Sequence, residues 1–364
     1  LSYADDNFLY ALTNPGAMPC DEEFFNLTNG KYGLDAKYLL CNGPFHVSKW
    51  TEKTSVKLAK NNEYNGESSV SPSSVTFYIN NDDSEVADKM NSVTYDVAFL
   101  SSSQFSSIEN KKDLNSVAVQ NVTYSFIFNQ NDNNYRNKNM RLAFCRSCDT
   151  SSLFDSQSDI SKADGIVPPS CKIGGEDYRN GNAAELLSYD ETLAKKNFND
   201  ALLELGSSSV ETTILCTEQY ESFVKQMVQK LQKTLGVKFV STVKVVSESD
   251  LEAAVNDGNY SVAFYPFKAK SSFAGEIIEG FDQNNIFGYE SDVLSQKIRN
   301  IKNNSGSLEG ERSAVADAEN YLVSEAVIMP VFYENSYFVT SKKTSGIYFY
   351  SSADNVCFIN AKKS

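Results

Sequence analysis

Two cysteines three positions apart and one histidine are the residues of this chain best suited to chemistry. Cys145 and Cys148 form the only close pair among seven cysteines, and His46 is the only histidine. A structural zinc site needs a second such pair or two histidines, so this set cannot supply one. A redox pair would start a helix after a strand, whereas the run Met140 to Phe144 predicts helix interior before Cys145. We therefore expect buried thiols or disulfides and no metal site.

The pairing of the cysteines is open at the level of sequence. In an oxidising compartment Cys20 could pair with Cys41, and Cys171 with Cys145 or Cys148. Spacing alone does not decide which of these connections forms.

Signatures of nucleophilic and nucleotide-dependent catalysis are missing from the sequence. Any Ser-His-Asp or Cys-His arrangement would have to use His46, which sits in an alternating strand pattern without a nucleophile motif. No Walker A, GxGxxG or EF-hand loop occurs. The acidic pairs Glu22-Glu23 and Asp82-Asp83 are typical of helix starts and turns. We predict no enzyme and no cofactor; a hydrolase that uses His46 is the enzymatic alternative.

The charge of the chain excludes two classes of partner. Lys and Arg number 33 against 47 Asp and Glu, which gives a net charge of -14. Such a chain repels nucleic acid and anionic membrane surfaces. The apolar run from Glu325 to Phe332 is far shorter than the roughly 20 residues of a membrane span, and the first residues lack a signal pattern. We expect either a cytosolic protein or one whose targeting segment has been removed.

A hairpin opens the first predicted lobe. Side chains alternate from Phe45 to Trp50 and again from Ser55 to Lys60, which predicts two antiparallel strands in which Trp50 is packed. A strand over Ser74 to Ile79, a helix over Asp82 to Asn91 and a strand over Tyr95 to Leu100 follow at short spacing. This order predicts an α/β lobe.

A second run of alternating elements predicts a second α/β lobe. Gly206 and Gly236 follow helical patterns and are typical helix ends. Pro168 and Pro169 predict an extended connection. The expected strands are 124–129, 211–216, 237–246, 260–265 and 327–340, and the expected helices are 138 onward, 190–205, 220–235, 250–256 and 311–324.

The order of these elements resembles the peptide- and nickel-binding class of extracytoplasmic solute-binding proteins that serve ABC transporters. Asn42-Gly-Pro-Phe45 resembles the Gly-Thr-Gly-Pro-Tyr hairpin of that class, and Asn61-Asn-Glu-Tyr-Asn-Gly66 resembles its Asn-x-x-Tyr-x-Gly loop. Further landmarks follow in the same order along the chain. They are Tyr95-Asp-Val-Ala98, Phe126-Ile-Phe-Asn129, Asn139-Met-Arg-Leu-Ala-Phe144, Tyr260-Ser-Val-Ala263 and Met329-Pro-Val-Phe332.

This resemblance implies a two-lobe, periplasmic-binding-protein-like α/β fold with mixed sheets. The first lobe would be residues 1–121 plus 335–364, and the second 122–334. Members of the class are longer at the N-terminus, which implies that the N-terminal part of the first lobe is missing here. The resemblance also implies a monomer outside the cytoplasm, either periplasmic or a cell-surface protein whose precursor carries a lipid anchor, with an ABC transporter permease as partner.

The implied function is binding of a peptide or other small polar solute between two lobes that hinge near 120–123 and 333–337. One departure concerns Phe264 to Ser271, which aligns with a segment whose aspartate receives the α-amino group of a peptide. Lys270 or a neighbour replaces that acid, which favours an anionic or polar ligand over a conventional peptide. The candidate ligand-binding residues are Tyr265, Phe267, Lys268 and Lys270 in the second lobe, with Asn129 and Ser101 near the lobe junctions.

Ordinary packing is the alternative for the two aromatic candidates, and a solvated loop charge is the alternative for the two lysines. A non-catalytic adhesion or sensor module that binds a protein partner on the same scaffold is the alternative function.

Overall fold

A computed structural model describes all residues except 1–11, 13–14, 67–68, 80–82, 109–110, 151–152, 155–157, 270, 283–284 and 351–354. The chain forms two compact units. The first unit comprises Leu1–Val119 with Ser336–Ser364, and the second comprises Gln120–Asn335. The chain therefore passes from one unit to the other twice.

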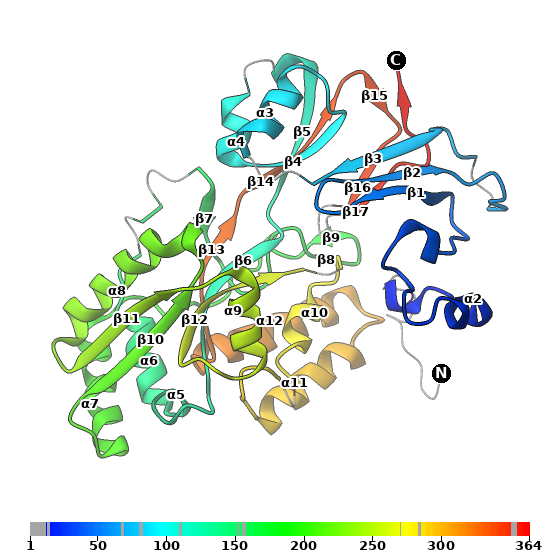
Figure 1. The fold of residues 1–364 in the computed structure, drawn as a ribbon. Helices are drawn as coiled ribbons and strands as arrows, with labels where there is room; N and C mark the ends of the chain where they lie inside the picture. The colour runs from blue at the N-terminus through cyan, green and yellow to red at the C-terminus, as the bar shows by residue number, and fades with distance from the viewer. Residues whose placement is uncertain are drawn as a thin grey trace. The chain divides into compact units, whose positions relative to one another are not determined.

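A six-stranded mixed sheet is the centre of the second unit (Figure 1). Its strand β6 is buried over almost its whole length and pairs antiparallel with β12 on one side and β13 on the other. Strand β10 runs parallel to both β11 and β12. In order across the sheet, the strands are β11 (Phe239–Val245), β10 (Val210–Cys216), β12 (Val262–Lys268), β6 (Val122–Phe128), β13 (Ile328–Glu334) and β7 (Ile160–Lys162).

Helices cover both faces of this sheet and enclose a hydrophobic core on each face. Phe126, Phe128 and Phe264 face the first core together with α5 (Asn133–Arg136), α6 (Lys138–Arg146), α7 (Glu191–Leu205) and α8 (Glu221–Leu235). Ile127 and Ala263 face the second core together with α9 (Glu248–Asn256), α10 (Gly275–Glu279), α11 (Asp292–Asn303) and α12 (Leu308–Ser324). Because β6 is covered on both sides, its side chains on both faces are apolar or small.

A buried ion pair fastens α12 to the segment that follows β7. The carboxylate of Glu319 pairs with the guanidinium of Arg179. It also accepts hydrogen bonds from the backbone N–H groups of Ile166 and Val167 at 2.7 and 2.9 Å, and from Tyr178 Oη at 3.1 Å. Glu319 is almost completely buried. The Glu319 carboxylate therefore accepts hydrogen bonds from the backbone of the extended segment that precedes Pro168.

The first unit contains two three-stranded antiparallel sheets. One has the order β1 (Phe45–Thr51), β2 (Ser55–Lys60) and β3 (Ser74–Tyr78), and the other has the order β4 (Val97–Ser101), β14 (Ser336–Ser341) and β5 (Leu114–Val119). Helices α3 (Asp83–Asn91) and α4 (Ser102–Ser107) pack with the second of these sheets around a small core. Further short elements of the first unit are α2 (Glu22–Leu27), β15 (Thr344–Ser345), β16 (Tyr348–Tyr350), β17 (Asn355–Cys357) and β18 (Lys362–Lys363), and the second unit also contains β8 (Lys172–Ile173) and β9 (Glu176–Asp177).

Most predicted elements are present, and their ends follow local chemistry. The hairpin of β1 and β2 is confirmed. Helix α7 begins after Asp190, whose carboxylate accepts from Leu193 N, and ends at Gly206, whose φ of 62° is in the left-handed region that glycine tolerates. The prediction that Trp50 is packed is wrong, because its residue is 42% exposed. Strand β1 carries it in the sheet of β1, β2 and β3, whose strands contain no buried residue.

The seven cysteines are free thiols in the structure, which contains none of the three pairings named above. The run from Met140 to Phe144 lies within α6 as predicted, Cys145 belongs to the last turn of this helix, and Cys148 follows the helix. Burial raises the pKa of each of these two thiols to about 12, so both are protonated at neutral pH. Within the described ranges, no three His, Cys, Asp or Glu side chains come together as metal ligands, and no helix is long and apolar enough to cross a bilayer.

Candidate functional site

One edge of the six-stranded sheet gathers the ends of four strands. Strands β10, β11, β12 and β13 end at this edge, and β6 begins there. In α/β proteins, ligands bind beyond the carboxyl ends of strands, where loops supply polar groups. Both connections to the first unit, after Val119 and after Asn335, leave from the same edge. This carboxyl edge is therefore the candidate site.

A hydrogen-bonded clamp joins the two connections. Gln120 Nε2 donates to Asn335 Oδ1 at 2.7 Å and to Ser161 Oγ at 2.8 Å. Asn335 N donates in turn to the carbonyl of Asp159 at 2.7 Å. Residues more than 200 positions apart in the chain are thus held side by side at the point where the chain leaves the second unit.

The predicted residues of β12 point to opposite faces of the sheet. Tyr265 and Phe267 are half-buried and pack against the second core, where the ring of Phe267 stacks on Phe281 at 5.7 Å. Lys268 is exposed, and successive residues of a strand alternate, so its side chain belongs to the other face. Lys270 lies outside the described residues. The structure therefore does not bring the aromatic pair and Lys268 together on one face.

The other two predicted residues have local structural partners. Asn129 lies at the opposite end of β6, where its amide donates to the carbonyls of Gly258 and Tyr260 at 2.8 and 2.7 Å. Ser101 belongs to the first unit and begins α4: its hydroxyl accepts from Gln104 N, while Gln104 Oε1 accepts from Ser101 N. Within the second unit, Asn129 does not lie at the carboxyl edge of the sheet.

Three residues that the sequence analysis did not single out form a connected group at the carboxyl edge. Tyr220 Oη donates to Glu334 Oε1 at 2.8 Å and accepts from Gln219 Nε2 at 3.1 Å. Glu334 ends β13, whereas Gln219 and Tyr220 follow β10. We call these residues, with Lys268, the Tyr–Glu cluster.

Burial sets the protonation chemistry of this cluster. It raises the pKa of Glu334 above the ordinary glutamate value, while the hydrogen bond from Tyr220 and the positive charge of Lys268 act in the opposite direction. Burial also raises the pKa of Tyr220, so its hydroxyl is a permanent donor. The cluster combines a carboxylate, a hydroxyl donor and an exposed ammonium group within one edge, which suits a small ligand with polar ends.

Position at a strand end was the signal that could have revealed the cluster. Glu334 is the last residue of β13, and Tyr220 sits in the short turn after β10. Tyr220 and Glu334 are 114 positions apart in the sequence. They meet because β10 and β13 lie on either side of β12 and β6 in the sheet. The sequence pattern predicts a helix from Tyr220 onward, whereas α8 begins at Glu221 and Tyr220 belongs to the turn before it.

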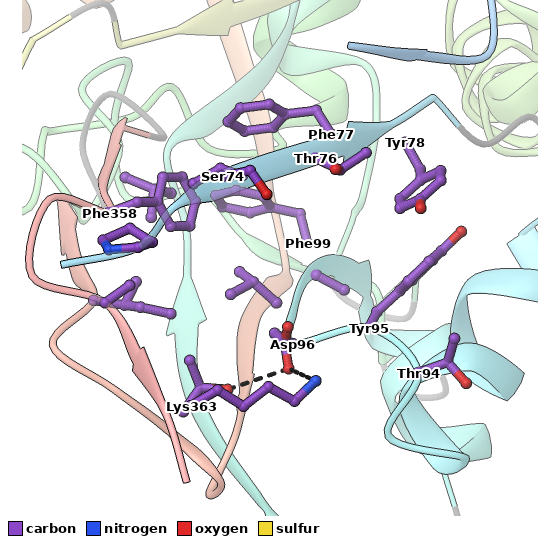
Figure 2. A pocket seen from close by; sticks show the side chains of 18 of the residues that line it. Ser74, Thr76, Phe77, Tyr78, Thr94, Tyr95, Asp96, Phe99, Phe358 and Lys363 are labelled. Carbon is purple, nitrogen blue, oxygen red and sulfur yellow. Dashed lines mark hydrogen bonds and ion pairs between the residues drawn. The ribbon is translucent and has the colours of Figure 1, made fainter. Parts of the chain in front are cut away.

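A separate cavity of about 700 Å³ lies in the first unit (Figure 2). Strand β3 and the segment Thr94–Phe99 line it, together with Phe358 and Lys363. Lys363 Nζ pairs with Asp96 Oδ1 at 2.9 Å, and this ion pair lies at one side of the cavity.

The chain is similar in sequence to known solute-binding proteins. A family model described as bacterial extracellular solute-binding proteins, family 5 Middle, matches residues 1–287. The dipeptide-binding protein DppE of Bacillus subtilis is 23% identical over 348 residues, which are 93% of this chain and 63% of that relative. The chain thus spans less than two thirds of the length of this curated relative.

Solved structures share the fold at low sequence identity. The substrate-binding domain of an oligopeptide ABC transporter from Bacillus anthracis superposes with a TM-score of 0.78 at 18% identity, over 99% of this chain and 72% of that one. Listeria monocytogenes OppA bound to peptide gives 0.77 at 21% identity, over 100% of this chain and 72% of that one. The mixed α/β fold and the family resemblance are confirmed. Because the family model covers most of the chain, this protein belongs to the bacterial extracellular solute-binding proteins of family 5.

Proposed function

We propose that the protein binds a peptide or other small polar solute outside the cytoplasm and delivers it to the permease of an ABC transporter. The match of the family model over residues 1–287 carries this proposal. Similar proteins support it, since they include a dipeptide-binding protein, a substrate-binding domain of an oligopeptide transporter and an OppA bound to peptide. The protein acts as a monomer without a cofactor and without catalysis, and a lipid anchor on its precursor holds it at the membrane.

The ligand is proposed to bind between two lobes that hinge at the two chain connections. The clamp of Gln120 and Asn335 supports this idea, because its hydrogen bond holds the two chain connections next to each other. Short chain segments that absorb a rotation are the usual hinges of two-lobe binding proteins. Closure around the ligand, rather than covalent chemistry, would then be the event that the permease reads.

Within the second unit, we propose that the Tyr–Glu cluster, which includes Lys268, contacts the polar ends of the solute. Lys268 suits a carboxylate, and Glu334 suits an ammonium group or another hydrogen-bond donor. Tyr265, Phe267 and Lys270 remain proposed contacts through their place at the end of β12 or just after it. For Asn129 and Ser101, the local hydrogen bonds described above favour a structural role.

The experiment is a thermal-stability screen of the purified 364-residue chain with di-, tri- and pentapeptides, amino acids and dicarboxylates. A ligand present at 100 times its dissociation constant stabilises the folded protein by about 2.7 kcal/mol, which moves the midpoint by several degrees. Calorimetry then measures the affinity of any solute that shifts the midpoint. Failure of every solute to shift the midpoint or to bind in calorimetry would refute the proposed function.

Lys268 provides a test of the site within that function. Lys268→Ala should weaken binding of a solute with a free carboxylate about tenfold or more, since a charge-assisted hydrogen bond contributes about 1.5–3 kcal/mol. The matched control is Lys238→Ala, which removes an exposed lysine next to the amino end of β11, at the opposite edge of the same sheet. Equal affinities of the two variants would remove Lys268 from the site.

A further inference from the structure

Three sulfur-containing side chains of the second unit belong to the core on one face of its sheet. Cys145 and Cys148 are 2% and 3% exposed, and Met227 of α8 is completely buried. Cys148 Sγ lies 3.2 Å from Met227 Sδ and 3.9 Å from the carbonyl oxygen of the same residue. The thiol of Cys148 therefore faces the thioether of α8 directly. We call Cys145, Cys148 and Met227 the sulfur cluster.

Helix geometry places the thiol of Cys145 on the same side as that of Cys148. Cys145 belongs to the last turn of α6, and Ser147, the residue that caps the helix, keeps helical backbone angles (φ -84°, ψ -16°). The chain thus remains helical up to Cys148, and residues three positions apart on a helix are neighbours on one face. In agreement with this geometry, both cysteines line one cavity.

The cavity that the two thiols line has a volume of about 210 Å³ and gives access to them. Buried apolar residues, among them Ile328 and Val331, form part of its wall. Asp149, Lys162 and Tyr189 also line it and are exposed, so the cavity reaches the surface. A small ion therefore has an entry path to the thiols, which a buried metal site requires.

Positive side chains act on the thiols of the sulfur cluster. Burial raises the pKa of Cys145, whereas the charges of Arg141 and Arg146 lower it. Burial likewise raises the pKa of the second thiol, where the charge of Lys230 lowers it and that of Asp149 acts in the opposite direction. A bound metal ion deprotonates the thiols that coordinate it, and nearby cations stabilise the resulting thiolates.

The third donor of the cluster is a thioether, which is not among the usual ligands of zinc. Histidine, cysteine and carboxylate side chains alone form no group of three among the described residues, and the sequence predicted no metal site for the same reason. Met227 is 79 positions from Cys148, so only the folded chain adds its sulfur to the cysteine pair. The resulting donor set consists of sulfur alone.

We propose that the sulfur cluster binds one Cu(I) ion, with the thiolates of Cys145 and Cys148 and the thioether of Met227 as ligands. Thiolate and thioether sulfurs are soft donors that select Cu(I), whereas structural Zn²⁺ takes four ligands. On binding, each thiol releases its proton to the solvent, two copper–thiolate bonds form, and Met227 Sδ donates a lone pair. The copper ion stays univalent throughout. This site lies within the second unit and is independent of the proposed solute binding.

The experiment measures Cu(I) binding without oxygen, in competition with the chelator bicinchoninate. The parent protein carries Cys20→Ser, Cys41→Ser and Cys357→Ser, because these thiols are less buried and would also bind copper. It should retain one Cu(I) per chain, show thiolate-to-copper charge transfer in its ultraviolet spectrum, and unfold at a higher temperature than without copper. Loss of all Cu(I) to the chelator would overturn the proposal.

Two serine substitutions separate the sulfur cluster from buried thiols in general. Cys148→Ser should lower the affinity for Cu(I) about a hundredfold or more, because it removes one of the two thiolates. The matched control is Cys171→Ser, which replaces a completely buried thiol in the core on the other face of the sheet. That control should bind Cu(I) like the parent. Equal affinities of the two variants would overturn the proposal.

Met227→Leu tests the thioether and covers the case in which Cys148→Ser does not fold. Leucine and methionine have similar volumes, so this exchange is well tolerated in cores. The variant should bind Cu(I) about tenfold more weakly, and Zn²⁺ in about tenfold excess should leave Cu(I) bound to the parent. Unchanged affinity of Met227→Leu, or displacement of Cu(I) by Zn²⁺, would overturn the three-sulfur site.

Discussion

The two units of this protein differ in how completely they cover their sheets. In the second unit, β6 is enclosed between two cores that contain fully buried aromatic rings such as Phe126, Phe128 and Phe264. In the first unit, the main described core has seven buried residues, all around the sheet of β4, β14 and β5. The sheet of β1, β2 and β3 has no buried residue in its strands. Stability therefore comes chiefly from the second unit.

A pair of phenylalanine substitutions tests this difference most strongly. Phe126→Ala in the second unit should lower the free energy of unfolding by about 3–5 kcal/mol, because it removes a completely buried ring and leaves a cavity. Phe99→Ala in the first unit should cost less than about 1 kcal/mol, because that ring is already partly in water. Urea unfolding followed by circular dichroism measures both values. Equal losses would mean that the two sheets are covered to the same degree.

Replacing the buried Glu319 of α12 should give a slightly smaller loss of stability than Phe126→Ala. Glu319→Gln removes the negative charge and leaves the buried guanidinium of Arg179 without its counter-ion, which should cost about 3 kcal/mol. Glu191→Gln is the matched control, because Glu191 and Lys195 form an exposed pair on α7. That control should change stability by less than about 1 kcal/mol. If both variants unfold at the same urea concentration, the network around Glu319 does not hold the segment before Pro168.

The smallest effect is a pH dependence that originates at Glu334. Burial raises the folded-state pKa of this residue, so the folded protein binds its proton more tightly than the unfolded chain does. The resulting stabilisation is complete below the unfolded value of about 4.3 and is lost as pH rises through the folded pKa. Glu334→Gln, which is neutral at every pH, should flatten the stability profile above pH 4 and be more stable than the parent at pH 7.

Guanidinium unfolding of both proteins at half-unit steps from pH 4 to pH 7 measures this profile. Parallel profiles would show that Glu334 has the same pKa in the folded and unfolded states. Glu204→Gln serves as the control, since this carboxylate is exposed and accepts hydrogen bonds from Asn137 and Asn139 at the surface.

Local chemistry made most of the fold predictable from sequence. Period-two alternation identified the hairpin of β1 and β2, and an aspartate before and a glycine after the helical pattern identified both ends of α7. Where an element lacked such markers, its end moved: the expected strand from Val237 begins at Phe239, because Gly236 and the two residues after it form a turn. The packing of Trp50 was predicted wrongly, since alternation identifies a strand without revealing whether anything covers it.

The candidate site was less accessible to sequence reasoning. Alternation along β12 places Tyr265 and Phe267 on one face of the sheet and Lys268 on the other. The expected strand ended at residue 265, so this alternation was not applied to Lys268. The meeting of Tyr220 with Glu334 depends on the order of strands in the sheet, which no short-range pattern contains. Asn129 was predicted as a ligand group near the lobe junctions, but it follows the opposite end of β6, and its amide donates to two carbonyls of a neighbouring loop.

Strand β12 also limits how this protein can change during evolution. Tyr265 and Phe267 belong to a core, and Lys268 belongs to the opposite face. A deletion of one residue in the turn before Val262 would exchange the two faces, placing the ammonium group of Lys268 against the rings of Phe281 and Phe287. Substitutions at the end of this strand can alter recognition one side chain at a time. Insertions and deletions before it cannot, so variation in length is expected to accumulate in turns that do not set the register of β12.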